Sequence, residues 1–200
     1  MRIPYGFDRL PRDPGLRCAE VGDEPLRLNS EPVPADEMPL ATGDHAARVA
    51  AALGWLESLC GDYAPLRPRF IAAYFRFVTA VIEAHRAELA EHLKPDDGLY
   101  APEDFLWSTL RPLPRGWVPV ADRYLPADMV FWDGTKTIAI ELAARDTDRQ
   151  KALLAAGVVV HRIDSAMMAS ALPDDFGRFW QTQSLPSRSV PRPGSACRRR

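Results

Sequence analysis

The sequence has little cysteine, no excess of either charge and no long apolar run. Its 200 residues include three cysteines, and Lys and Arg total 25 against 27 Asp and Glu. Cys18, Cys60 and Cys197 lie far apart and have no histidines at metal-binding spacing, which argues against a disulfide framework or a zinc site. The balanced charge removes the overall basic excess of many nucleic-acid-binding proteins, so any such contact must come from a local patch.

The absence of a long apolar run also limits where the protein works. No segment approaches the roughly 18 apolar residues that a membrane helix needs. The first residues lack the apolar core of a secretory signal. We therefore expect a cytoplasmic protein with no membrane partner. Hydrophobic residues make up 46% of the chain, which is enough for one sizeable core.

Proline and apolar spacing divide the first half of the chain. Seven of the 19 prolines fall in the first forty residues, so residues 1–43 are predicted to form a Pro-rich arm, either disordered or lying along the folded body. Residues 44–98 are predicted to be helical, with helices over 42–61 and 68–93. Aromatic residues recur at helical spacing in the second helix and are interpreted as core rather than as a base-stacking surface: Phe70, Tyr74 and Phe77.

The second half alternates between helical and strand-like patterns. Residues 99–182 are predicted to form one core, and the basic tail 183–200 is predicted to be disordered. Asp133-Gly134 is a strong hairpin signal between two strand-like runs. The predicted elements are a helix at 102–107, strands at 117–120, 127–132 and 137–142, a helix at 146–156, a strand at 158–163 and a further helix at 172–181.

Two acids lie inside apolar strands, where a carboxylate is costly unless it is paired, hydrogen-bonded or bound to a metal. Asp128 falls in the first strand of the hairpin and Glu141 near the end of the second. Antiparallel pairing brings both acids to the same end of the hairpin, where they could share a divalent cation. The alternative is structural: Asp128 caps a bend after Pro126, and Glu141 pairs with Arg145 or Arg162.

The order and spacing of several short motifs resemble the very-short-patch-repair-like endonucleases of the PD-(D/E)xK superfamily. The resemblance covers about residues 100–165. The motifs are Glu103-x-Phe105-Leu106-Trp107, Pro126-Ala127-Asp128, Ile140-Glu141-Leu142, Asp148-Arg149 and Ala156-Gly157-Val158-x-Val160-x-Arg162. The resemblance implies an α/β (α+β) chain with a restriction-endonuclease-like αβββαβ core, that is, a mixed sheet flanked by helices, here preceded by an N-terminal helical extension.

The same resemblance implies a function and a set of site residues. It implies a DNA endonuclease that hydrolyses phosphodiester bonds with Mg²⁺ or Mn²⁺. Asp128 would be the metal-bridging aspartate, Glu141 the second metal-binding acid, and Glu103 the helix carboxylate that orders the metal or its waters. The family pattern has a lysine two residues after the glutamate, but this chain has Ala143.

Three residues are candidates to compensate for the missing lysine: Lys151 as a migrated lysine, His161 as a base or water positioner, and Lys136, which lies beside the hairpin turn and is expected to point away from Asp128. Retention of both acids favours an active endonuclease, whereas Ala143 favours a catalytically inactive nuclease-like module for DNA binding or protein interaction. A third reading is a helical scaffold whose hairpin acids form ordinary ion pairs. The helices of 44–94 could hold a protein partner or a second copy of the chain.

Overall fold

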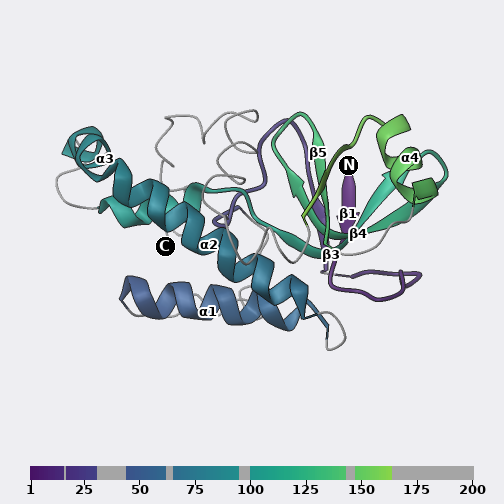
Figure 1. The fold of residues 1–200 in the computed structure, drawn as a ribbon, viewed down its shortest axis with the longest axis horizontal. Coiled ribbons are helices and arrows are strands. Elements are labelled where there is room, and N and C mark those ends of the chain that lie inside the picture. Colours follow the sequence, from purple (N-terminus) through teal and green to yellow (C-terminus); the bar gives the residue numbers. More distant parts are fainter. Residues whose placement is uncertain (16, 31–43, 62–64, 95–99, 143–146, 164–200) are drawn as a thin grey trace, which may run out of the picture.

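The computed structural model describes residues 1–15, 17–30, 44–61, 65–94, 100–142 and 147–163 (Figure 1). None of the helices in these ranges is long and apolar enough to cross a membrane. The elements are β1 (Arg2–Pro4), β2 (Cys18–Glu20), α1 (His45–Ser58), α2 (Leu66–Ala84), α3 (Arg86–Leu93), the 3-10 helix η2 (Pro102–Ser108), β3 (Leu113–Val120), β4 (Arg123–Trp132), β5 (Thr137–Glu141), α4 (Thr147–Ala155) and β6 (Val159–Arg162).

A four-stranded mixed sheet lies at the centre of the fold. Its strand order is β3-β4-β5-β6, with two antiparallel pairs followed by a parallel pair. The hairpin between β4 and β5 turns at Asp133-Gly134, where Gly134 has a φ of +96° and the Asp133 carboxylate accepts from the backbone N–H groups of Thr135 and Lys136. The predicted mixed sheet and α+β class are thus confirmed, although β3 begins at Leu113 rather than at residue 117.

Strand β4 packs against α2 through Phe131. Phe131 of β4 meets Phe70 and Tyr74 edge to face, with ring centroids 6.3 and 5.5 Å apart. Both α2 aromatics are at most 1% exposed, so the aromatic stripe belongs to the core, as predicted. Figure 1 shows α2 and α4 on either side of the sheet.

The predicted single helix over 68–93 is wrong in one respect, because the structure divides it into α2 and α3 at His85. The buried face of α2 ends at Ile82, and the only buried residue of α3 is Leu93. His85 leaves helical geometry with φ −108° and ψ 13°. The α3 segment then packs alongside η2, and His92 of α3 lies next to Phe105 of η2. The break thus lets the chain pack on η2 once the core-facing stripe has ended.

The described residues of the arm, 1–15 and 17–30, lie along the folded body. β1 and β2 form an antiparallel pair, and Ile3, Tyr5, Leu26 and Leu28 are at most 4% exposed. Residues 31–43 lie outside the described residues, as do the predicted helix at 172–181 and the basic tail at 183–200.

Gly116 provides a test of the packing between β3 and β4. A Cβ at this position would lie 2.5 Å from Val130 Cγ2 and 3.2 Å from the Leu113 carbonyl oxygen. Gly116→Ala is therefore expected to lower the free energy of unfolding by about 1–3 kcal/mol, measured by urea denaturation. The matched control is Gly54→Ala at an exposed position of α1, where the added Cβ would have no neighbour within 4 Å. It should stabilise the protein by about 0.5–1 kcal/mol, and equal effects of the two changes would contradict the packing argument.

Candidate functional site

Four charged residues form one row across the sheet, one from each strand. The β3–β4 pairs on either side, Pro114–Met129 and Gly116–Ala127, place Arg115 opposite Asp128. The β4–β5 register, extended one residue beyond Met129–Ile140, places Asp128 opposite Glu141. The parallel pairing of β5 with β6 then places Arg162 beside Glu141. The hairpin therefore brings the two acids to neighbouring positions, as the sequence predicted. What those carboxylates contact decides their chemistry.

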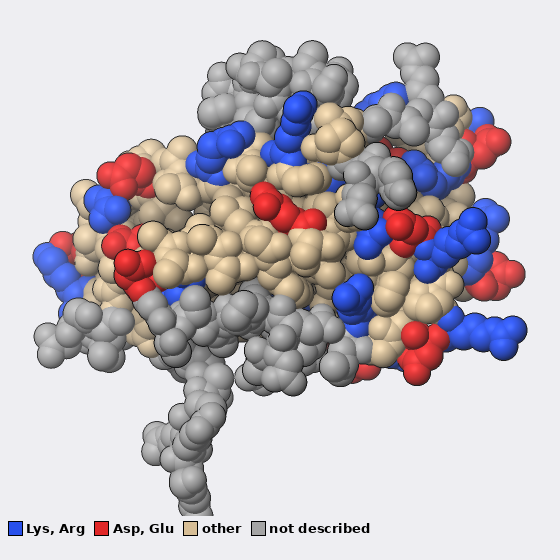
Figure 2. All heavy atoms as spheres, turned by 90° about the horizontal axis from the view of Figure 1, so that it is seen from below, with Lys and Arg blue, Asp and Glu red and all other residues tan. Residues whose placement is uncertain are grey.

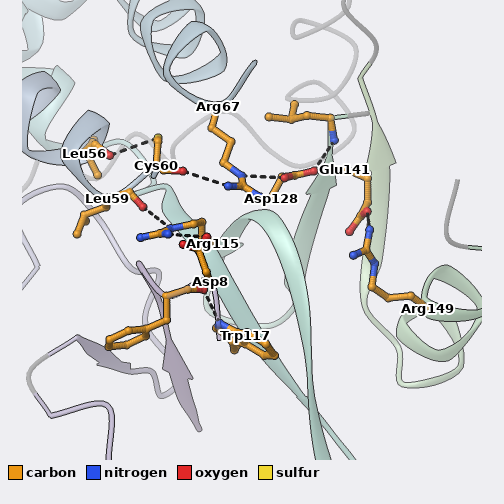
Figure 3. A network of polar contacts seen from close by, with 12 residues as sticks. Asp8, Leu56, Leu59, Cys60, Arg67, Arg115, Trp117, Asp128, Glu141 and Arg149 are labelled. Atoms are coloured by element: carbon orange, nitrogen blue, oxygen red, sulfur yellow. Dashed lines mark hydrogen bonds and ion pairs between the residues drawn. The ribbon is translucent and has the colours of Figure 1, made fainter. Parts of the chain in front are cut away.

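The Asp128 carboxylate uses both oxygens within the protein (Figure 3). Arg67 Nε donates to Oδ1 at 2.8 Å, and the Leu142 backbone N–H donates to Oδ2 at 2.9 Å. Arg67 comes from the first turn of α2 and also donates through Nη1 to the Cys60 carbonyl at 3.0 Å. Charge-assisted bonds of this kind are about twice as strong as neutral ones. Asp128 thus fastens α2 to the end of β5.

The Glu141 carboxylate faces α4 instead. Arg149, in the first turns of α4, forms an ion pair with Glu141 Oε2. The Glu141 side chain is only 8% exposed, so an uncompensated charge there would be costly. One prediction from the sequence was that Glu141 pairs with Arg145 or Arg162. The partner in the described part of the chain is Arg149, and Arg145 lies outside that part.

Arg115 connects the row to the N-terminal arm and to α1. Its Nε donates to the Leu59 carbonyl at 2.8 Å, its Nη1 lies 2.7 Å from Asp8, and its Nη2 donates to the Gly6 carbonyl. The hydrogen bond from Arg115 and its charge lower the pKa of the Asp8 carboxyl. Arg115 and Arg67 together satisfy carbonyls at the C-terminal end of α1, where positive charge is favourable.

The cysteine at this end of α1 is inert. The Cys60 thiol is fully buried and lies 3.5 Å from the Leu56 carbonyl. Burial raises its pKa to about 12, so almost none of it is thiolate at neutral pH, and the thiolate is the reactive form. Cys60 thus contributes its carbonyl, and not its thiol, to the network.

The other three predicted site residues, His161, Lys151 and Glu103, lie in three different surroundings. His161 is half-buried and pairs in register with Ile140, one residue before Glu141. Lys151 lies on the exposed side of α4, 3.9 Å from Asp148, with 73% of its side chain exposed. Glu103 on η2 pairs with Arg86 at 3.3 Å. Neither Lys151 nor Glu103 joins Asp128 and Glu141.

The arrangement of the acids does not fit a divalent cation. Mg²⁺ needs several oxygens directed at one point, whereas Asp128 turns to Arg67 and Glu141 turns to Arg149 (Figure 3). Among the described residues, no three His, Cys, Asp or Glu side chains group in a way that could hold a metal ion. A cation bound between these acids would meet two guanidiniums, which repel it.

Arg67 is the partner of Asp128 that the sequence did not predict. It lies 61 residues before Asp128 in the sequence, and no local spacing connects the two. Arg149 and Arg115 were visible as basic residues near the motif, but their carboxylate partners were not. Their roles depend on the tertiary packing of α1, α2 and α4 against the sheet.

Comparison with known proteins leaves this site to be judged on its own geometry. A scan against protein-family models, a search of curated proteins and a search of solved structures each return no match to the chain. The relationship to PD-(D/E)xK endonucleases therefore remains a prediction from sequence motifs.

The Arg67–Asp128 pair should carry a measurable coupling energy. Its side chains are 22% and 20% exposed. A double-mutant cycle of Arg67→Met and Asp128→Asn should therefore give a coupling of about 1–3 kcal/mol in urea unfolding. The control cycle uses Arg86 and Glu83, whose side chains are 47% and 64% exposed and should couple by about 0.3–0.5 kcal/mol. Coupling as weak as the control would contradict the structural role of Arg67.

His161 should make stability depend on pH. Burial lowers its pKa below the ordinary value of 6.5. The unfolded chain therefore binds the proton first as pH falls, and stability present above about pH 6.5 is lost between that value and the lower folded pKa. Urea unfolding from pH 8 to 5 should show this loss.

The loss should be smaller in His161→Gln, which has no imidazole to titrate. An identical pH slope in the wild type and His161→Gln would rule out this origin of the pH dependence.

Proposed function

We propose that this chain is a nuclease-like module that binds DNA and does not hydrolyse it. The observation that carries the proposal is that Asp128 and Glu141 are each paired with an arginine, Arg67 and Arg149. The resemblance described above supplies DNA as the ligand. The ion pairs favour the inactive form of such a domain over the active one.

Hydrolysis of a phosphodiester needs an activated water and neutralisation of the charge that develops at phosphorus. Acids at the positions of Asp128 and Glu141 serve that reaction by holding a cation. Here both are engaged by guanidiniums, and Ala143 replaces the family's lysine. Lys151, the candidate replacement, points into solvent next to Asp148. The described residues thus support phosphate binding better than water activation.

The binding function rests on the arginines of the site. Three arginines of the site are each paired with a carboxylate: Arg67 with Asp128, Arg115 with Asp8 and Arg149 with Glu141. Arg162, beside Glu141 in the sheet, adds a fourth guanidinium, so these residues carry one excess positive charge. Arg162 is exposed at the end of the row and is the residue best placed to contact a phosphate. Lys and Arg are interspersed with Asp and Glu on the face in Figure 2, so we expect modest, salt-sensitive affinity.

A metal-dependent DNA endonuclease is the second candidate, because the register places Asp128 and Glu141 on neighbouring strands of the sheet. That position is where the resemblance expects the two acids. Mg²⁺ or Mn²⁺ would then have to displace Arg67 and Arg149 from them. The two candidates give opposite results in a cleavage assay.

The test is cleavage and binding by the full-length chain. With Mg²⁺ or Mn²⁺, supercoiled and single-stranded DNA should stay intact to the same extent with the wild type, Asp128→Asn and Glu141→Gln. In fluorescence anisotropy the wild type should bind duplex DNA. Arg162→Gln should weaken binding about fivefold at 50 mM salt and reduce the slope against log salt by about one.

The matched control is Arg123→Gln, an exposed arginine five residues along β4 from Asp128, about 17 Å away at the rise of a strand. It should bind like the wild type. Cleavage by the wild type that both acid variants abolish would establish the endonuclease instead. Absence of binding, or equal losses in Arg162→Gln and Arg123→Gln, would contradict the proposed binding site.

A further inference from the structure

Arg115, at the β3 end of the charged row, has a strained backbone and a fixed side chain. Its φ is +48°, a left-handed value that is uncommon for a residue other than glycine. Two of its three side-chain nitrogens are used by carbonyls, because Nε donates to Leu59 at 2.8 Å and Nη2 donates to Gly6. Gly61 leaves room for the guanidinium, since a Cβ there would lie 2.7 Å from Nη1. The fold thus holds this guanidinium in one place and directs Nη1 at an acid.

The acid at Nη1 is Asp8, and it lies at the surface (Figure 3). Asp8 Oδ1 is 2.7 Å from Arg115 Nη1, and the Asp8 side chain is 72% exposed whereas that of Arg115 is 12% exposed. The carboxylate therefore covers the guanidinium from the solvent side. An ion pair with one partner this exposed contributes little stability, because water screens it. An anion that arrives from solvent can thus take the place of Asp8 without opening the core.

The arm that carries Asp8 is held on β3 by its backbone. Gly6 N–H donates to the Pro114 carbonyl at 2.8 Å, and Trp117 Nε1 donates to the Phe7 carbonyl at 3.0 Å. These two bonds involve residues 6 and 7, whereas the Asp8 side chain extends into solvent. Exposed side chains change rotamer rapidly. Asp8 can therefore leave Arg115 while the arm stays in place.

The position of the Asp8 carboxylate suits a phosphate of the DNA backbone. Arg115 and also Arg67 lower the pKa of the Asp8 carboxyl, so two guanidiniums favour a negative charge at this point. Arginine binds the oxygens of a carboxylate and of a phosphate in the same way. Arg162 ends the charged row on β6, three strand spacings from β3, which is about 14 Å. Phosphates could thus be bound at both ends of the row.

We propose that Asp8 occupies a phosphate site on Arg115 and thereby weakens the binding of DNA. This inference rests on the proposed function and adds to it a second phosphate contact, at the opposite end of the row from Arg162. In the wild type a phosphate has to displace the Asp8 carboxylate from Nη1. The observed affinity is therefore reduced by the fraction of molecules in which the carboxylate holds that nitrogen.

The experiment compares the full-length wild type with Asp8→Asn and Asp8→Glu in fluorescence anisotropy with duplex DNA. Asp8→Asn removes the competing charge, so it should bind about fivefold more tightly at 50 mM salt. Its slope against log salt should be steeper by about 0.9, because the phosphate on Arg115 now releases its counterion without a displaced carboxylate to offset the release. Asp8→Glu keeps the charge and the reach of the side chain, and it should bind like the wild type.

The matched control is Asp13→Asn, which removes the same charge from an exposed residue of the same arm. Asp13 Oδ1 accepts from Gly15 N–H at 2.9 Å within its own turn. This variant should keep the affinity and the salt slope of the wild type. All three changes are at exposed positions, so each protein should fold.

The possible failures of the two proposals look different. If the wild type binds DNA and Asp8→Asn binds no more tightly than Asp13→Asn, the role of Asp8 is overturned and the binding function stands. An equal gain in Asp8→Glu and Asp8→Asn would also overturn it, because glutamate keeps the competing charge. If neither the wild type nor Asp8→Asn binds DNA, both proposals are overturned.

Discussion

The ion pair between Arg67 and Asp128 is the contact on which the arrangement of the site depends. Arg67 begins α2 and binds a carbonyl at the end of α1, while Asp128 binds the backbone of Leu142 at the end of β5. One pair of side chains therefore fixes two helices against two strands. Breaking it would leave a mostly buried carboxylate without its cation, which costs more than the pair contributes when intact.

The strand β4 supplies residues both to the core and to the site. In β4, Met129 and Phe131 are fully buried, and Phe131 packs against the aromatics of α2. The β4–β5 pairing ends at Met129–Ile140, and Asp128 lies one residue beyond that pair. There the Asp128 carboxylate, rather than a backbone carbonyl, accepts the hydrogen bond from Leu142 N–H. The end of the sheet is thus closed by a side chain, which accounts for an acid within an apolar strand without any ligand.

Local patterns in the sequence predicted most of the elements and the neighbouring positions of the two acids. The Asp133-Gly134 turn and the apolar runs on both sides of it determine the hairpin and its register, and register alone places Asp128 beside Glu141. The partners of these acids were not predictable in this way. Arg67 acts across 61 residues, and its contact exists only once α2 has packed on the sheet. The helix break at His85 was missed because the charged pattern continues through it while the buried face ends.

The three paired arginines and Arg111 show two ways of burying a guanidinium in one fold. Arg67, Arg115 and Arg149 each form an ion pair with a carboxylate, so the charges of these arginines are compensated within the protein. Arg111 is buried as well, and among the described residues its Nη1 donates to the Ser30 carbonyl. Motif position alone therefore does not determine what an acid contacts, because Asp128 and Glu141 keep their predicted places in the register while each pairs with an arginine.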